Sequence, residues 1–244
     1  MNDKIVVVTG AAGGLGKAFA EAFSNAGAKV AVCDKNMEGA KATANALRNA
    51  IAVEVDITNT ESLEQMTQTI LDTWGGIDVL VNNAAVYAGL ERKPFYELSE
   101  KEWDLVMNVN VKGLWMVCKS VAPIMMEKRA GKIVNVASAT FMSGSPNWSH
   151  YVASKGAVIG FTRSIAKELG DYNINVNAIA PGFTLTQASL DLMENAQQYG
   201  VNRGAIKRPS SAEDIVGTAL YLASSGSDFV TGQTIIVDGG KQFI

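Results

Sequence analysis

The sequence is poor in cysteine and in long hydrophobic runs. Only two of its 244 residues are cysteines, and neither Cys33 nor Cys118 belongs to a CxxC pair or to another spacing typical of metal ligands. This pattern predicts two reduced thiols in the core and no metal site. No apolar stretch approaches the roughly 18 residues that a membrane-spanning helix needs.

The sequence also lacks an excess of basic charge. It has 21 basic and 24 acidic residues, a net charge of −3, and no run of Lys or Arg. Nucleic acids and anionic membranes bind proteins through basic clusters, so a small molecule is the expected partner. Strand-like sequence begins at Lys4, which leaves no room for a signal peptide, and we expect a soluble, cytoplasmic protein.

What the sequence has is a regular alternation of short β-branched runs with longer helical segments. Runs that are apolar on both faces are typical of parallel strands covered by helices. The alternation predicts an α/β doubly wound Rossmann fold: one domain over residues 1–244, with a seven-stranded parallel sheet flanked by helices on both faces. The strand-like runs are 5–8, 30–33, 51–55, 78–81, 133–136, 174–179 and 234–237, and the helical segments are 14–26, 36–48, 60–74, 100–128, 149–171 and 210–225.

Residues 183–207 interrupt this alternation. The segment follows Pro181-Gly182 and has only weak helical periodicity. Long insertions of this kind often cover a binding site, so the segment is predicted to be a substrate-binding lid.

A glycine-rich turn joins the first predicted strand to the first helix. Gly10, Gly14 and Gly16 stand where the pyrophosphate of a dinucleotide needs room and free backbone N–H groups, although three glycines can also form an ordinary tight turn. Asp34 ends the second strand, 18 residues after Gly16. A carboxylate there can accept hydrogen bonds from the adenosine ribose, which favours the dinucleotide interpretation.

The same carboxylate predicts NAD as the cofactor rather than NADP. Asp34 would repel a 2′-phosphate, and residues 10–16 contain no Arg or Lys that could neutralise it. Lys35 is the one nearby cation that could reach such a phosphate, and we expect it to be a solvated surface side chain.

Tyr151 stands four residues before Lys155 in a predicted helix. The two residues share a helix face, so the ammonium can lie near the phenol and favour the phenolate. At an effective dielectric of about 20, a unit charge about 4 Å away contributes on the order of 4 kcal/mol, or about three pKa units, and burial opposes this shift. By itself the spacing is common, and a surface tyrosine beside a lysine stem is its ordinary explanation.

Taken together, these motifs resemble the short-chain dehydrogenases/reductases, and the resemblance covers the whole chain. The shared motifs are TGxxxGxG at 9–16, Asp34, Asp56-Ile57, NNAA at 82–85, Asn110 in NVNVKG, Ser138 in VNVAS, Tyr151-x-x-x-Lys155 and Pro181-Gly182. Ala85 departs from the family, which usually has glycine there. The resemblance implies an NAD-dependent oxidoreductase (EC 1.1.1.-) that transfers a hydride between NAD and an alcohol or its carbonyl.

The resemblance also implies a role for each catalytic residue. Tyr151 takes the alcohol proton in oxidation and returns it in reduction, while Ser138 holds the substrate oxygen by a hydrogen bond. Lys155 binds the ribose hydroxyls, and Asn110 holds a water that connects Lys155 to solvent.

In the same way, the resemblance places Asp56 at the adenine, Asn83 along the ribose, and Thr184 and Thr186 at the nicotinamide carboxamide. The implied cofactor site comprises Gly10, Gly14, Leu15, Gly16, Asp34, Asp56, Ile57, Asn83, Tyr151, Lys155, Pro181, Gly182, Thr184 and Thr186.

The substrate pocket is predicted from the segment that separates Ser138 from Tyr151. Phe141 and Met142 are expected to form its walls, with Pro146, Asn147 and Trp148 as further candidates, although side chains in such a segment can also serve only for packing. This segment resembles family members that oxidise ring-bearing alcohols, of the pyridoxal 4-dehydrogenase and 1-phenylethanol dehydrogenase type. The expected substrate is therefore a secondary alcohol, with an aromatic or cyclic one favoured.

Two alternatives stay open. Within the family, the protein could be a 3-oxoacyl-thioester or sugar-alcohol reductase; a thioester would favour a basic entrance, for which the sequence offers Arg92, Lys93, Arg203, Lys207 and Arg208. In another class, it could be a non-catalytic NAD-sensing scaffold, which the intact Ser138, Tyr151 and Lys155 disfavour. An acidic residue such as Glu91, Asp191 or Glu194 could face a basic substrate, but all three are expected to be solvated.

The last two expectations concern surfaces. His150, the only histidine, adjoins Tyr151, but consecutive helix residues point about 100° apart, so we expect it at the surface or in an interface, with contact to the substrate as the alternative. The helical segments 100–128 and 149–171 carry more apolar and small residues than one sheet face requires. As in similar proteins, this predicts a homotetramer.

Overall fold

The β-branched runs form one parallel sheet. The computed structural model describes residues 1–192 and 195–243. The strands are β1 (Ile5–Thr9), β2 (Lys29–Asp34), β3 (Ala50–Glu54), β4 (Val79–Asn82), β5 (Gly131–Val136), β6 (Ile174–Pro181) and β7 (Thr234–Val237). Their order across the sheet is β3-β2-β1-β4-β5-β6-β7, and all of them pair in parallel. The predicted seven-stranded, doubly wound sheet is confirmed.

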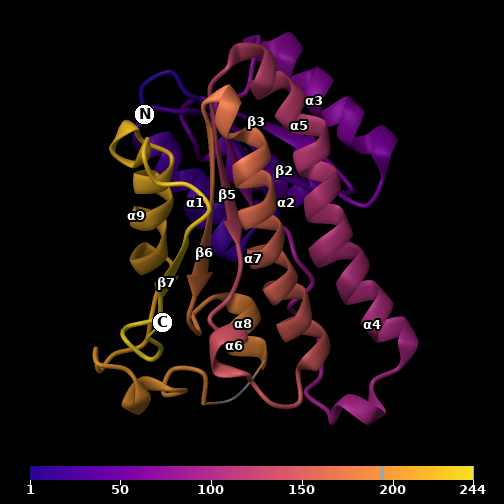
Figure 1. Cartoon of the computed structure of the whole chain (residues 1–244), viewed down its shortest axis with the longest axis vertical. Coiled ribbons are helices and arrows are strands. Elements are labelled where there is room, and N and C mark those ends of the chain that lie inside the picture. Colours follow the sequence, from indigo (N-terminus) through magenta and orange to yellow (C-terminus); the bar gives the residue numbers. More distant parts are fainter. Residues whose placement is uncertain (193–194, 244) are drawn as a thin grey trace.

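Helices cover both faces of this sheet (Figure 1). They are α1 (Gly14–Asn25), α2 (Met37–Asn45), α3 (Thr60–Trp74), α4 (Glu100–Met107), α5 (Leu114–Lys128), α6 (Thr140–Ser143), α7 (Ser149–Leu169), α8 (Gln187–Leu192) and α9 (Glu213–Leu222). Successive strand residues point to opposite faces, so Val7 packs with α3, α5 and α7, whereas Val6 and Val8 pack with α1, α2 and α9. This is why the strands are apolar at almost every position.

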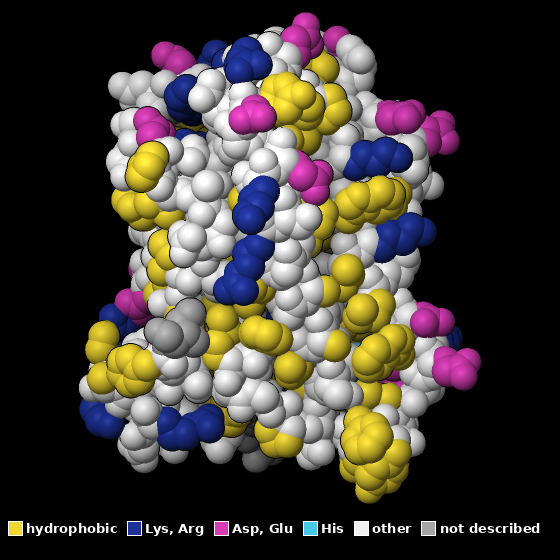
Figure 2. All heavy atoms as spheres, viewed as in Figure 1, with side chains coloured by type: hydrophobic (Ala, Val, Ile, Leu, Met, Phe, Trp, Pro, Cys, Tyr) yellow, Lys and Arg dark blue, Asp and Glu magenta, His cyan; other side chains and the backbone are white. Residues whose placement is uncertain are grey.

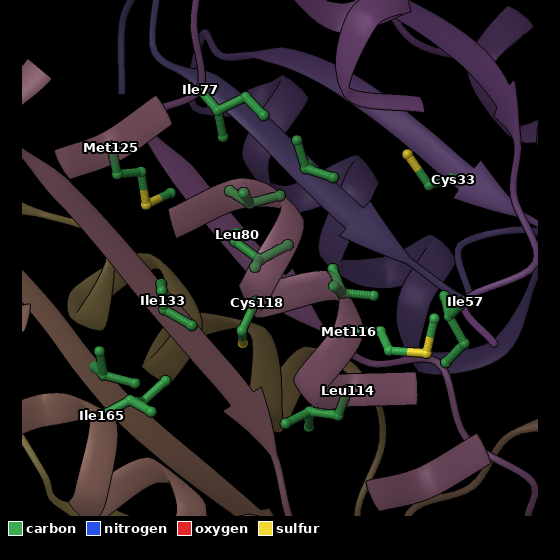
Figure 3. Close-up of a cluster of buried hydrophobic side chains, with 14 of the residues drawn as sticks. Cys33, Ile57, Ile77, Leu80, Leu114, Met116, Cys118, Met125, Ile133 and Ile165 are labelled. Carbon is green, nitrogen blue, oxygen red and sulfur yellow. The ribbon is translucent and has the colours of Figure 1, made fainter. Parts of the chain in front are cut away.

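The core on the α5 face contains both cysteines. Figure 3 shows Cys118 of α5 close to Leu80 and Ile133, which come from the neighbouring strands β4 and β5. Cys33 lies in the same cluster, and both thiols are buried. Burial raises the pKa of both thiols, that of Cys118 to about 12. The prediction of reduced core thiols agrees with this placement.

The predicted helix over 100–128 is wrong in one detail. A π-helical turn, Asn108–Gly113, separates α4 from α5. The turn adds a residue to the helical ladder, and such insertions are frequent at functional sites. Gly113 packs closely there, because a Cβ would lie 2.8 Å from Cδ1 of Ile57 and would displace that side chain. The helical period alone could not reveal this insertion.

The predicted lid contains short elements. Besides α8, it has a 3₁₀ turn at Val201–Arg203, and Thr184 forms an isolated bridge with Ser210. Residues 193–194, and with them the candidate Glu194, lie outside the described residues. The role of the segment as a lid stays a prediction.

Several large apolar side chains are exposed on α4 and α5. Figure 2 shows hydrophobic side chains on the flank of the molecule where these helices lie, and Trp103, Leu105 and Trp115 are among the exposed residues. The predicted homotetramer would need such a surface, and it stays a prediction. No helix within residues 1–192 and 195–243 has the length and apolarity needed to cross a bilayer.

Candidate active site

The glycine turn is tightly packed against the end of β4. A Cβ on Gly16 would lie 2.0 Å from the Gly10 carbonyl oxygen, and one on Gly10 would lie 2.7 Å from Cα of Ala84. Gly10 and Gly14 also have positive φ angles, 66° and 54°, which favour glycine. Any side chain at Gly10 or Gly16 would push these segments apart. Glycine at both positions therefore allows the turn to pack closely against the end of β4.

Asn83 fixes this turn in place. Its side-chain amide donates to the carbonyls of Thr9 and Gly10 at 3.1 and 3.0 Å. The Thr9 hydroxyl accepts the backbone N–H groups of Asn83 and Ala84 at 3.1 and 3.2 Å. Asn83 therefore holds the turn by hydrogen bonds, which is a structural role in addition to the ribose contact implied by the resemblance.

Asp34 supports the turn from the end of β2. One carboxylate oxygen accepts the N–H of Ala12 at 2.9 Å, and the other accepts the N–H of Asn36 at 2.8 Å. A carboxylate offers about four lone-pair sites, so both oxygens can accept further bonds. The residue lines the cavity described below and fits the predicted contact with ribose hydroxyls.

Lys35 is exposed as predicted, but it is paired rather than free. Its ammonium lies 2.7 Å from a carboxylate oxygen of Asp56. Hydrogen bonds from Lys35 and Thr58 lower the pKa of Asp56 to about 2. The Asp56 carboxylate therefore competes with any phosphate for the Lys35 ammonium.

Ser138, Tyr151 and Lys155 come together where β5 ends and α7 begins. All three are buried, with exposed fractions of 8%, 6% and 4%, and all three line the same cavity. Tyr151 and Lys155 are one helical turn apart on α7, as their spacing predicted. Ser138 follows β5, where it accepts hydrogen bonds from the N–H and the hydroxyl of Thr140 at 3.2 and 3.0 Å.

We expected the Lys155 ammonium to lower the pKa of the Tyr151 phenol, and this expectation is wrong for this structure. Burial raises the pKa of Tyr151, and the neighbouring Tyr87 adds to the increase, whereas a hydrogen bond with Ser138 lowers it. Burial lowers the pKa of Lys155 to about 8. The Lys155 ammonium donates to the Val136 carbonyl at 2.7 Å and lies 5.7 Å from the centre of the Tyr151 ring. Its charge therefore does not offset the burial of the phenol.

Asn110 lies in the π-helical turn and links three segments. Its side-chain oxygen accepts the N–H of Val86 at 2.7 Å, and its amide donates to the Val86 carbonyl and to the Ser154 hydroxyl, each at 3.2 Å. It is 1% exposed and is not among the residues that line the cavity. Asn110 thus connects the turn to the end of β4 and to α7. Its proposed part in a proton relay stays a prediction.

A cavity of about 800 Å³ brings most of the predicted site residues together. The predicted residues that line it are Gly10, Gly14, Leu15, Asp34, Asp56, Ile57, Asn83, Ser138, Tyr151, Lys155, Pro181, Gly182, Thr184 and Thr186. Four others do not line it: Gly16, Asn110, Phe141 and Met142. The cavity lies at the carboxyl ends of the strands, where ligands bind in open α/β sheets.

The prediction that Phe141 and Met142 form walls of the substrate pocket is therefore wrong. The Phe141 ring packs over Gly156 of α7, where a Cβ would meet it at 2.7 Å, and Met142 packs against the hydrophobic core. Of the further candidates, Pro146 and Trp148 line the cavity and Asn147 does not. The short helix α6 turns the earlier side chains away from the cavity, and a sequence pattern cannot predict that rotation.

Tyr87 is a wall residue that the sequence did not indicate. Its ring centre lies 5.4 Å from that of Trp148 and 5.7 Å from that of Tyr151, and the Trp148 and Tyr151 centres are 4.8 Å apart. The three rings form one apolar wall beside the Tyr151 phenol. The position of Tyr87 after a strand end was the only available signal.

The surface position expected for His150 is wrong. The side chain is 1% exposed, because α4 packs against α7 here. Burial lowers the pKa of His150, and the charge of Glu102 raises it. His150 does not line the cavity, which agrees with the prediction that it cannot share the focus of Tyr151.

The parallel sheet places a glycine turn, a strand-end carboxylate and a buried Ser, Tyr and Lys around one cavity. This combination defines a dinucleotide-binding α/β oxidoreductase. A family model described as enoyl-(acyl carrier protein) reductase matches residues 10–242. The 3-oxoacyl-(acyl-carrier-protein) reductase FabG of Thermotoga maritima is 38% identical over 98% of each chain. Sorbitol dehydrogenase of Cereibacter sphaeroides is 37% identical over 99% of this chain and 98% of the relative.

A solved structure of a similar reductase supports the same family. The 3-ketoacyl-(acyl-carrier-protein) reductase of Brucella melitensis, complexed with NADH, superimposes with a TM-score of 0.92 over 99% of both chains at 29% identity. The chain belongs to the short-chain dehydrogenase/reductase family, as the motifs predicted, and it is an oxidoreductase of the nicotinamide-dependent kind.

Replacement of Asn110 by Ala is expected to destabilise the protein. The change leaves the partly buried N–H and carbonyl of Val86 without their partners, which costs about 1–3 kcal/mol. Urea unfolding followed by circular dichroism measures the loss. Asn108→Ala is the matched control, because Asn108 is exposed in the same π-helical turn. An equal effect of the two changes would show that the buried hydrogen bonds are not responsible.

Proposed function

We propose that the protein transfers a hydride between NAD and a secondary alcohol or the corresponding carbonyl compound. The observation that carries this proposal is the convergence of Ser138, Tyr151 and Lys155 in the cavity that the glycine turn and Asp34 also line. The nicotinamide cofactor supplies the hydride acceptor or donor when it is bound. The chain positions the substrate oxygen and moves its proton.

Tyr151 is proposed to carry that proton and Ser138 to hold the substrate oxygen in line. In carbonyl reduction the neutral phenol donates its proton, a state that burial favours by raising the pKa of Tyr151. In alcohol oxidation the phenol must first lose its proton, so a positive charge near the ring would assist. Lys155, buried one helical turn away, is placed to supply charge and to bind ribose hydroxyls.

The proposed cofactor is NAD rather than NADP. Asp34 presents its carboxylate to the cavity, and Lys35 is held by Asp56. The similar reductase of Brucella melitensis binds NADH in its solved structure, which supports this choice.

For the substrate, the relatives favour the alternatives over the ring-bearing alcohols. The curated relatives named above are a 3-oxoacyl-(acyl-carrier-protein) reductase and a sorbitol dehydrogenase. We infer that the substrate is a 3-oxoacyl or 3-hydroxyacyl compound or a polyol. A pyridoxal-like substrate has no support beyond the local resemblance, and the non-catalytic sensor is disfavoured by the intact Ser138, Tyr151 and Lys155.

Replacement of Tyr151 by Phe is expected to lower kcat by about 10²–10⁴-fold, the usual contribution of a general acid or base. The affinity for NAD should stay within about twofold, because the ring and its packing remain. Absorbance at 340 nm, with acetoacetyl thioesters, sorbitol and benzylic alcohols as substrates, measures turnover, and fluorescence titration measures NAD binding.

The control for this change is Tyr96→Phe. Tyr96 is 73% exposed and is not among the residues that line the cavity, so its hydroxyl should not affect the rate. Full activity of Tyr151→Phe would exclude Tyr151 as the acid or base.

The rate of carbonyl reduction is expected to fall as the pH rises through about 8. Lys155 loses its proton there, while the phenol of Tyr151, whose pKa burial raises, keeps its own. A pH profile of kcat with NADH tests this, and a rate that stays constant to pH 9.5 would contradict it. In Lys155→Met the rate should be low at every pH.

Replacement of Asp34 by Asn is expected to lower the preference for NAD over NADP at least about tenfold in kcat/KM. The change removes the charge that repels a 2′-phosphate and keeps an oxygen that can accept the Ala12 N–H. Asp104→Asn, an exposed aspartate on α4, is the control. A preference of the unaltered enzyme for NADP would overturn the role of Asp34.

A further inference from the structure

Three cations from distant parts of the chain line the cavity. Arg92 follows β4, Arg203 ends the 3₁₀ turn in the predicted lid, and Lys241 follows β7; all three line the cavity. The glycine turn, Asp34 and Asp56 line the same cavity. One cavity therefore has both a group of carboxylates and a group of cations along its wall.

Tyr199 is the centre of the cationic group. The guanidinium carbons of Arg92 and Arg203 lie 5.7 and 5.6 Å from the centre of its ring. Burial acts to raise the pKa of Tyr199, but Arg92 and Arg203 outweigh it, and the pKa is lowered. The two guanidinium groups thus act on the same phenol from separate segments.

Arg203 and Lys241 approach each other over Gly200. A guanidinium nitrogen of Arg203 and the ammonium nitrogen of Lys241 lie 3.3 and 3.4 Å from the point where a Gly200 Cβ would stand. Burial lowers the pKa of Lys241, Asp238 raises it, and the like charge of Arg203 lowers it further. Both cations therefore border the same point beside Gly200, and a negatively charged ligand near that point would be favoured.

The described part of the chain does not neutralise these cations with a short ion pair. Within residues 1–192 and 195–243, no carboxylate lies within 4.0 Å of the charged nitrogens of Arg92, Arg203 or Lys241. Asp238, the carboxylate that raises the pKa of Lys241, has one oxygen bonded to the N–H groups of Gly240 and Lys241.

Other basic residues of the same region behave differently. Lys93 pairs with Glu102 and Glu91, and Arg208 pairs with Asp214. Lys207 donates to the carbonyl of Asn202 at 3.0 Å. None of these three lines the cavity. Five basic residues were predicted to be available for a basic entrance to the substrate site. Of these five, only Arg92 and Arg203 line the cavity.

The cationic group is connected to the reacting end through one aromatic wall. The guanidinium carbon of Arg92 lies 4.6 Å from the centre of the Trp148 ring, and Trp148 packs directly on Tyr151. A compact substrate can thus place its carbinol oxygen at Tyr151 and extend along Trp148 toward Arg92.

We propose that Arg92, Arg203 and Lys241 form, with Tyr199, an anion-binding subsite that holds a carboxylate or phosphate carried by the substrate itself. The proposal rests on the proposed function, because it concerns the same cavity. The substrate class that it names is a hydroxy or oxo compound with an acidic group a few bonds from the reacting carbon. Neutral polyols and aromatic alcohols would leave the subsite without a ligand.

The first experiment measures binding without turnover. Malonate and inorganic phosphate are titrated into the protein at low ionic strength by isothermal titration calorimetry, with chloride as the control for screening. Arg203→Met and Lys241→Met should each weaken binding about tenfold, and Arg203→Lys should weaken it less than Arg203→Met. Lys207→Met is the matched control, since Lys207 lies four residues from Arg203 but outside the cavity lining, and it should have no effect.

Two outcomes of this experiment overturn the proposal. Equal weakening by Lys207→Met, or equal competition by chloride, would show general charge attraction. A parallel loss of NAD affinity in Arg203→Met and Lys241→Met would assign the cations to the phosphates of the cofactor. Because no turnover is measured, failure of the proposed hydride transfer does not affect the result.

The second experiment distinguishes a substrate group from a free anion. 3-Hydroxybutyrate and its neutral amide are compared as substrates with NAD, and the unaltered enzyme should prefer the acid at least about tenfold in kcat/KM. This preference should fall to near unity in Arg203→Met. Equal rates for acid and amide in the unaltered enzyme, with phosphate still bound, would mean that the subsite takes a free anion and would overturn the assignment to substrate.

Discussion

The site depends on the close contact between the glycine turn and the end of β4. The carbonyl of Gly10 occupies the space where a side chain of Gly16 would stand, and Asn83 and Thr9 lock the two segments together by hydrogen bonds. This contact fixes the distance between the first helix and the centre of the sheet. Gly10, Gly14 and Asp34 consequently share one cavity with Ser138 and Tyr151, which come from the other half of the chain.

Burial is the second determinant of the chemistry. It raises the pKa of Tyr151 and lowers that of Lys155, so both groups favour their neutral forms more than they would in water. The cavity is also asymmetric in charge, with Asp34 among the residues near the glycine turn and Arg92, Arg203 and Lys241 around Tyr199. A ligand that bridges the cavity would therefore contact opposite charges at different points.

The prediction that Phe141 and Met142 form the walls of the substrate pocket failed for a physical reason. Phe141 and Met142 are apolar and follow Ser138 closely, but α6 turns them toward α7 and the core. The walls are instead Trp148 and Tyr87, the latter from a loop after β4. Loop side chains can point either way without changing the pattern of the sequence, and substrate class is determined by them.

The sequence by itself determined the order of strands and helices, the glycine turn, Asp34 at the end of β2, and the spacing that puts Tyr151 and Lys155 on one face of α7. These are local patterns, in which period and backbone freedom fix the outcome. Only the tertiary structure decided the π-helical turn at Asn110, the burial of His150, the pKa directions of Tyr151 and Lys155, and the meeting of Arg92, Arg203 and Lys241. Each of these depends on which distant segments pack together, and packing between distant segments leaves no local period in a sequence.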